Sequence, residues 1–144
     1  MSAIIESTIL SSLGGQVGSN PKVLNIYPES EKLIAASDQL LLKGLPNGCT
    51  PGDFIVGKIQ NMLFCSFIIE IENPTDRNDL VSIGFIIDIN TILGELKTIL
   101  NEMFSFLKEN NLITYAILNN ILPGIIEGIN NQKNIIIHEP HSGK

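Results

Sequence analysis

The stretch DFIVGKIQNMLFCSFIIEIENPTDRNDLVSIGFIIDI (residues 53–89) decides the predicted fold. Its two most apolar runs flank the turn segment NPTDRND (73–79), a pattern typical of a β-hairpin. Alternate residues from Leu63 to Ile71 share one face of the first run, and those from Val81 to Ile89 share one face of the second. Because both runs are apolar on both faces over much of their length, we expect the sheet to be covered on both sides.

The rest of the chain predicts further strands and helices around this hairpin. Strands are expected at 3–11, 22–27 and 53–60, the second of them at a sheet edge because it carries polar residues. A helix is expected from an N-cap at Ser30 to a C-cap at Lys43-Gly44. Asn90 is the expected N-cap of a helix at 91–109, with Ile92, Leu96, Ile99, Met103 and Phe106 in its apolar stripe. A last helix from about 114 to 122 should kink or break at Pro123, and a continuation for one turn over IIEGIN (125–130) stays open.

Length and composition indicate one acidic domain. The chain has 144 residues and a net charge of −6, with a single arginine, Arg77. Such a charge disfavours nucleic acid and anionic membranes as partners. No apolar run approaches the ~20 residues that a membrane span needs, and the N-terminus lacks a basic signal region, so we expect no membrane insertion and a cytoplasmic location. Cys49 and Cys65 are expected to remain unpaired.

The sequence contains no convincing catalytic or metal-binding pattern. Residues 52–58 (GDFIVGK) match the start of a phosphate-binding loop, but the match coincides with a predicted strand and Ile59 follows where Ser or Thr is needed. His138 and His141 make an incomplete zinc site. Glu70 and Glu72 form a carboxylate pair that we interpret as a solvated strand end without a pocket. We therefore predict a non-enzymatic protein with no cofactor and no metal.

Three segments carry a resemblance to a known family. They are SNPKVLNIYPES (19–30), CSFIIEI (65–71) and the Arg77 turn that leads into LVSIGFIIDI (80–89). In this order the chain resembles a longin domain, in particular the N-terminal longin modules of DENN-type and nitrogen-permease-regulator-like proteins. As a module by itself it is similar to small archaeal-type longin proteins. The resemblance implies an α+β fold over residues 1–131, with the tail 132–144 outside it.

The longin resemblance also implies a fold order and a function. The expected five-stranded antiparallel sheet follows the order strand, strand, helix, three strands, helix, helix, with one helix on one face and two on the other. The expected function is non-catalytic protein binding, as a scaffold or regulator, with a small GTPase or another longin or roadblock protein in vesicle trafficking or nutrient signalling. A homodimer is a further possibility. The candidate interface residues lie on the 53–60 edge strand, the first helix and the turn: Phe54, Ile55, Val56, Ile59, Leu40 and Arg77.

A second function class stays open. Five-stranded sheets with helices on both faces also form PAS-like and GAF-like sensor domains, which bind small ligands in a pocket between sheet and helix. The predicted inner faces are rich in Ile, Leu and Phe, which favours a filled core. A metabolite that raises the melting temperature would support the sensor hypothesis.

Overall fold

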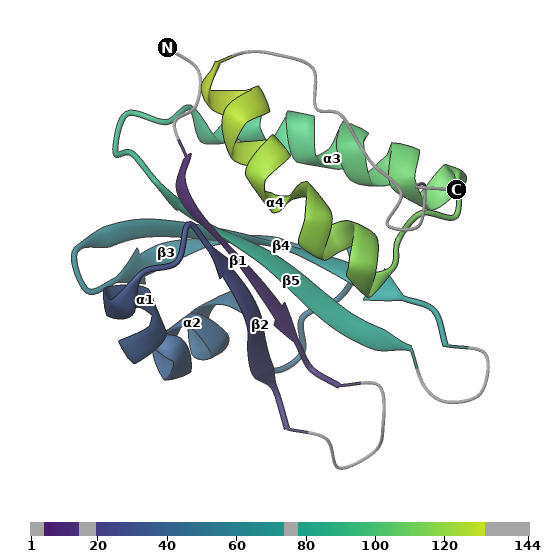
Figure 1. The fold of residues 1–144 in the computed structure, drawn as a ribbon, viewed down its shortest axis with the longest axis horizontal. Coiled ribbons are helices and arrows are strands. Elements are labelled where there is room, and N and C mark those ends of the chain that lie inside the picture. The colour runs from purple at the N-terminus through teal and green to yellow at the C-terminus, as the bar shows by residue number, and fades with distance from the viewer. Residues whose placement is uncertain (1–4, 15–19, 74–77, 132–144) are drawn as a thin grey trace.

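The computed structural model describes residues 5–14, 20–73 and 78–131 and has an α+β fold (Figure 1). One open, five-stranded antiparallel sheet has the spatial order β2-β1-β5-β4-β3, which confirms the predicted sheet. Its strands are β1 (Ile5–Ser12), β2 (Lys22–Tyr27), β3 (Phe54–Ile59), β4 (Met62–Ile71) and β5 (Asp79–Ile87). The helices are α1 (Glu31–Ala35), α2 (Ser37–Gly44), α3 (Leu93–Glu109) and α4 (Tyr115–Asn130).

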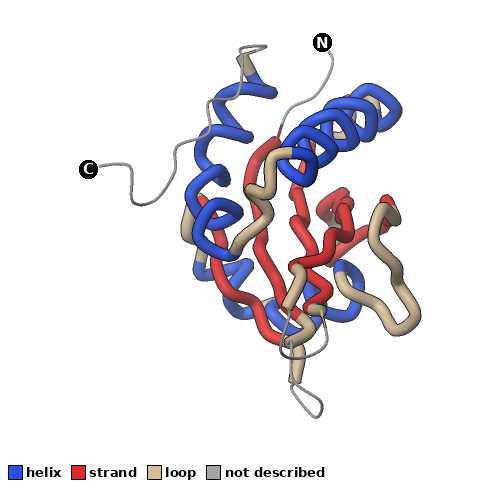
Figure 2. Tube along the Cα trace, turned by 90° about the vertical axis from the view of Figure 1, so that its right-hand side faces the viewer, coloured by secondary structure: helices blue, strands red, loops and turns tan. Residues whose placement is uncertain are grey.

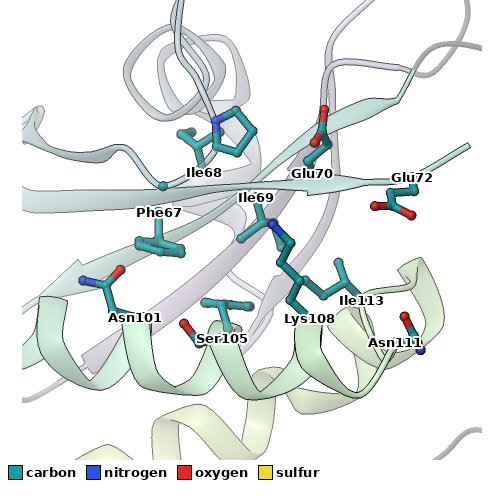
Figure 3. Close-up of a pocket in the computed structure, with 13 residues that line it drawn as sticks. Phe67, Ile68, Ile69, Glu70, Glu72, Asn101, Ser105, Lys108, Asn111 and Ile113 are labelled. Atoms are coloured by element: carbon teal, nitrogen blue, oxygen red, sulfur yellow. The ribbon is translucent and has the colours of Figure 1, made fainter.

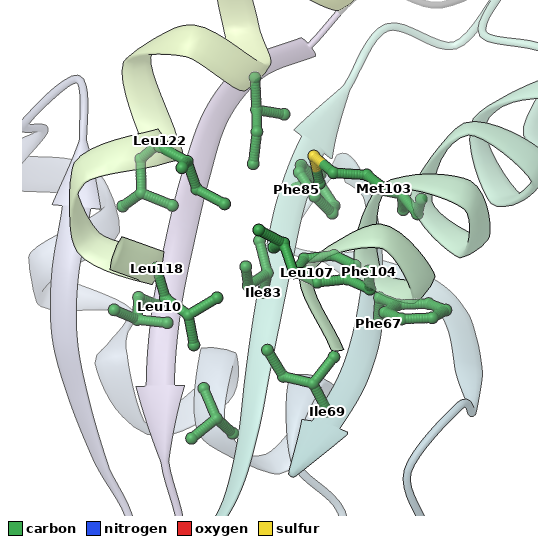
Figure 4. Close-up of a cluster of buried hydrophobic side chains, with 14 of the residues drawn as sticks. Leu10, Phe67, Ile69, Ile83, Phe85, Met103, Phe104, Leu107, Leu118 and Leu122 are labelled. Carbon is green, nitrogen blue, oxygen red and sulfur yellow. The ribbon is translucent and has the colours of Figure 1, made fainter. Parts of the chain in front are cut away.

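Helices cover both faces of the sheet, and the two sides differ in size. Figures 1 and 2 show α3 and α4 on one face and the short α1 and α2 on the other. The larger core lies under α3 and α4, where inward residues of β4 and β5 such as Phe67, Ile83 and Phe85 meet Phe104 and Leu107 (Figure 4). Burying apolar side chains contributes roughly 25 cal/mol per Å², so this layer is the main source of stability.

The smaller core, under α1 and α2, is organised around Phe64. This ring is fully buried together with Leu33 and Leu40. A Cβ built on Gly84 of β5 would lie 2.8 Å from the ring, and one built on Gly44 of α2 would lie 3.0 Å from it. Phe64 is therefore held between two glycines, whose missing side chains leave the space that its ring occupies.

The helix predicted from residue 31 to 43 is in fact two short helices. Ser30 is its N-cap as predicted, because its side chain accepts a hydrogen bond from the Leu33 N–H. Ala36 leaves the helical conformation, with φ −97° and ψ 17°, and the Ser37 hydroxyl donates to the Ile34 carbonyl at 2.6 Å. A serine that hydrogen-bonds nearby main chain competes with helix continuation, which explains the break. The expected glycine C-cap is also wrong, since Gly44 is the last helical residue and Leu45 is the cap.

The expected start of α3 is wrong as well. The helix begins at Leu93 after Ile92, and the Asn90 N–H donates to the Asp88 carboxylate instead of Asn90 capping the helix. Ile89 lies beyond the end of β5 and is 80% exposed, so it does not belong to the buried face assigned to it. Of the predicted stripe, Ile92 and Phe106 are exposed. The buried face consists of Leu96, Leu100, Met103, Phe104 and Leu107.

The last helix continues past Pro123 through residues 125–130, the alternative that the sequence left open. Thr114 caps it by accepting from the Ile117 N–H, and α4 then runs through Pro123 to Asn130 without ending there. A proline inside a helix removes one backbone hydrogen bond and costs about 3 kcal/mol. Burial on the sheet offsets this cost, because residues on both sides of Pro123 are buried, among them Leu122 and Ile125.

Candidate functional site

The sheet ends in two strands, β2 and β3, that have a neighbour on one side only within the described chain. On β3 the direction of the main-chain groups follows from two hydrogen bonds of Ile68 in β4, which accepts from the Gly52 N–H at 2.8 Å and donates to the Asp53 carbonyl at 3.0 Å. Successive residues of a strand point their main-chain groups to alternate sides. With Ile55 opposite Ser66, the residues whose main chain points outward are Phe54, Val56 and Lys58.

The structure separates the predicted interface residues into exposed and buried ones. Val56 is 45% exposed, and Phe54 and Ile55 are half-buried. Ile59 and Leu40 are 0% and 1% exposed, so neither contributes to the surface of the folded chain. Arg77 lies outside the described residues.

The other sheet edge has an apolar surface that the sequence reasoning missed. Leu24 and Tyr27 of β2 and Ile34 of α1 are each more than a third exposed and line a shallow hollow of about 550 Å³. Leu24 and Tyr27 are three positions apart, so strict alternation would place them on opposite faces of β2. The pairing of β1 with β2 shifts its register beside Leu24, and the sequence KVLNIY does not show this shift.

A groove lies between the end of β4 and α3 (Figure 3). Its volume of about 370 Å³ falls in the range of about 300–1,000 Å³ that is typical of ligand pockets. Glu70 and Glu72 are among the residues that line it, which the sequence did not predict, and both side chains are exposed, as predicted for a solvated strand end. The groove could not be predicted from the sequence, because it depends on the distance between α3 and β4.

The groove combines an apolar floor with polar walls. Phe67 of β4 and Phe104 of α3 stack below it, with ring centroids 5.2 Å apart and planes at 12°. The exposed helix residues Asn101, Ser105 and Lys108 line it from α3, and Lys108 reaches toward β4 in Figure 3. A ligand here could bury an apolar group and place a negatively charged group beside Lys108.

A buried carboxylate forms a second polar cluster, also missed from the sequence. Asp79, 2% exposed at the start of β5, accepts hydrogen bonds from the Ser12 hydroxyl at 2.6 Å, the Gly14 N–H at 2.8 Å and the Tyr115 hydroxyl. These donors belong to β1, the residues that follow it, and α4. Asp79 therefore ties the start of α4 to the sheet, and all of its contacts are structural.

Three side chains, Cys49, Cys65 and Tyr115, hold their proton more tightly in the folded chain than in the unfolded chain, and the pKa shift is large for Cys65 and Tyr115. Burial raises the pKa of the Cys65 thiol from 9.0 to about 12. Burial of the hydroxyl, together with its hydrogen bond to Asp79, raises the pKa of Tyr115 from 10.0 to about 12, although the residue as a whole is 43% exposed. Both groups stabilise the fold fully at pH values below their ordinary pKa, and this stabilisation is lost as the pH rises through the folded values.

We therefore expect the free energy of unfolding to fall between about pH 9 and pH 12. Urea unfolding at a series of pH values measures this dependence. The double variant Cys65→Val with Tyr115→Phe should show a shallower decline, because both titrating groups are gone. An equally steep decline in the double variant would contradict the assignment.

Other residues singled out in the sequence do not come together. The segment 52–58 enters β3, with Phe54 to Lys58 in the strand, so it does not form a loop before a helix. His138 and His141 lie outside the described residues. Within the part of the chain that the structure describes, no group of three or more His, Cys, Asp or Glu residues is placed to hold a metal ion, and Cys49 and Cys65 are unpaired.

Comparison with known proteins identifies no family for this chain. No family model matches it, and no curated protein matches it in sequence. Among the described residues, the helices are also too short or too polar to cross a membrane.

Proposed function

We propose that this protein is a non-catalytic interaction module that binds a protein partner through an open edge of its sheet. The observation that carries the proposal is the β3 edge, where Val56 exposes both an apolar side chain and outward main-chain groups. Exposed strand edges recruit further strands, and main-chain hydrogen bonds then supply affinity. The acidic charge of −6 favours protein partners over nucleic acid.

The partner classes that we propose follow from the resemblance to longin domains. They are a small GTPase, or another longin or roadblock protein that acts with one, in membrane traffic or signalling. A second copy of this chain is a further partner for the same edge. A scaffold or regulator role fits a surface that presents backbone and apolar groups to a partner.

Affinity capture from a native lysate followed by mass spectrometry tests this function, with Val56→Pro as the informative variant. Proline at Val56 removes an outward N–H and blocks strand addition, whereas an edge position tolerates it. Val56→Thr is the matched control because it keeps the N–H and the β-branched shape. We expect a small GTPase, longin or roadblock protein to be enriched by the wild type and by Val56→Thr, and to be lost with Val56→Pro.

The alternative is a small-ligand sensor, and the groove between β4 and α3 is the observation that favours it. Thermal-shift screening against metabolites distinguishes the two functions, because a ligand of the native state raises the melting temperature. A metabolite that raises the melting temperature, combined with capture of none of the named protein classes, would replace the proposed function with the sensor.

A further inference from the structure

Besides the edge strands β2 and β3, the sheet has a third, shorter stretch of open edge, which lies in the groove between β4 and α3. β3 begins at Phe54, opposite Phe67, whereas β4 continues to Ile71. Just before β3, Gly52 and Asp53 form backbone hydrogen bonds with Ile68 of β4. The end of β4 therefore extends past its neighbour, with Pro51 and Gly52 at the near end of the groove.

The main chain of Glu70 faces this open edge. Ile68 directs its N–H and C=O toward the β3 side, so the alternation of the strand directs those of Glu70 the same way. Within the described residues, no backbone group on that side hydrogen-bonds the N–H or C=O of Glu70. A donor and an acceptor are thus presented side by side, which is the arrangement that an added strand uses.

The residues that line the groove determine which side chains an added strand could place there. In an extended segment every second side chain points to the same face. On the α3 side these side chains would lie over Phe67 and Phe104, which suits an apolar residue. Lys108 is the one basic side chain among the lining residues, and Figure 3 shows it on the α3 side of β4 with Glu70 on the opposite side. An acidic residue two positions from the apolar one would therefore meet Lys108.

We propose that this groove binds a short extended segment of a partner protein, which pairs with Glu70 and places an apolar side chain and, two positions along, an acidic side chain against α3. The proposal rests on the proposed function, since it names a peptide class within the partner. The net charge of −6 makes a polyacidic segment unfavourable, so one acidic residue is expected.

Selection from a phage-displayed library of random octapeptides, followed by fluorescence anisotropy with the synthetic winners, tests the proposal. We expect peptides with an apolar and an acidic residue, weakened about tenfold or more by Lys108→Glu. Lys97→Glu, which reverses another exposed lysine of α3 outside the groove, should leave affinity unchanged. Glu70→Pro, which removes the outward N–H, should abolish binding. Should that variant not fold, Ser105→Trp, which fills the groove from an exposed helix position, takes its place.

The outcomes separate this proposal from the proposed function. The groove proposal would be overturned if the affinity of the selected peptides is unchanged by Lys108→Glu and by Ser105→Trp. It would also be overturned if the selection yields no binding peptide. If a protein is still captured through Val56 in those cases, the edge function stands and only the groove proposal fails. A metabolite whose thermal shift disappears in Ser105→Trp, without any peptide binding, would assign the groove to a small ligand instead.

Discussion

Replacing Gly84 by valine is expected to lower the free energy of unfolding by about 3 kcal/mol, the upper part of the range for overpacked cores. The Cβ alone would lie 2.8 Å from the Phe64 ring. That ring cannot move away, because it is 1% exposed and Gly44 closes it in from α2. Urea unfolding followed by circular dichroism measures the loss.

Gly57→Val is the matched control, because a Cβ on Gly57 of β3 has no atom within 4 Å. It should be neutral or slightly stabilising, since valine favours a strand. Phe64→Leu frees space at the same place, so the double variant with Gly84→Val should recover about 1 kcal/mol or more relative to the sum of the single losses. Strict additivity would show that Phe64 is not the obstacle.

Replacing Asp79 by alanine is the second large change, with an expected loss of about 3 kcal/mol. It leaves the Ser12 hydroxyl, the Gly14 N–H and the Tyr115 hydroxyl without their acceptor. Each buried donor that loses its partner costs about 1–3 kcal/mol. The total is at the low end here, because Tyr115 is partly exposed and water can replace its lost acceptor. Thermal and urea unfolding give the magnitude.

Asp79→Asn keeps one acceptor oxygen and should lose about half as much. Asp88→Ala removes a carboxylate at the opposite end of β5, where it accepts one exposed N–H from Asn90, and should cost less than 1 kcal/mol. Equal losses for Asp79→Ala and Asp88→Ala would contradict a structural role for the buried cluster.

The sheet was predictable because its signal is local. Each run from β3 to β5 alternates or is continuously apolar, and the turn segment 73–79 separates the last two, so the strands and their order along the chain follow from the sequence. The same alternation along the strand also indicates that Val56 is exposed. The ends of the helices were less predictable. Asn90 and Gly44 look like capping residues, but the Asn90 N–H donates to the Asp88 carboxylate, and Gly44 lies against the Phe64 ring.

The candidate sites were less predictable because they join distant residues. The groove needs Phe67 and Phe104, 37 positions apart, to stack at the correct distance. Asp79 contacts Ser12 across 67 positions and Tyr115 across 36, and no single-sequence pattern links them. Leu40 was a candidate interface residue because it lies on the first helix, beside the expected edge strand, but the sequence does not reveal which side of a short helix packs on the sheet.

Strand addition at the β3 edge is tested most directly by amide hydrogen exchange, measured residue by residue by NMR on the chain alone and with its captured partner. We predict that the outward amides of Phe54, Val56 and Lys58 exchange rapidly in the free chain and become protected by tenfold or more in the complex. The inward amides of Ile55 and Gly57, already paired with β4, serve as the internal reference. Outward amides that exchange equally fast in the presence of a bound partner would contradict strand addition at this edge.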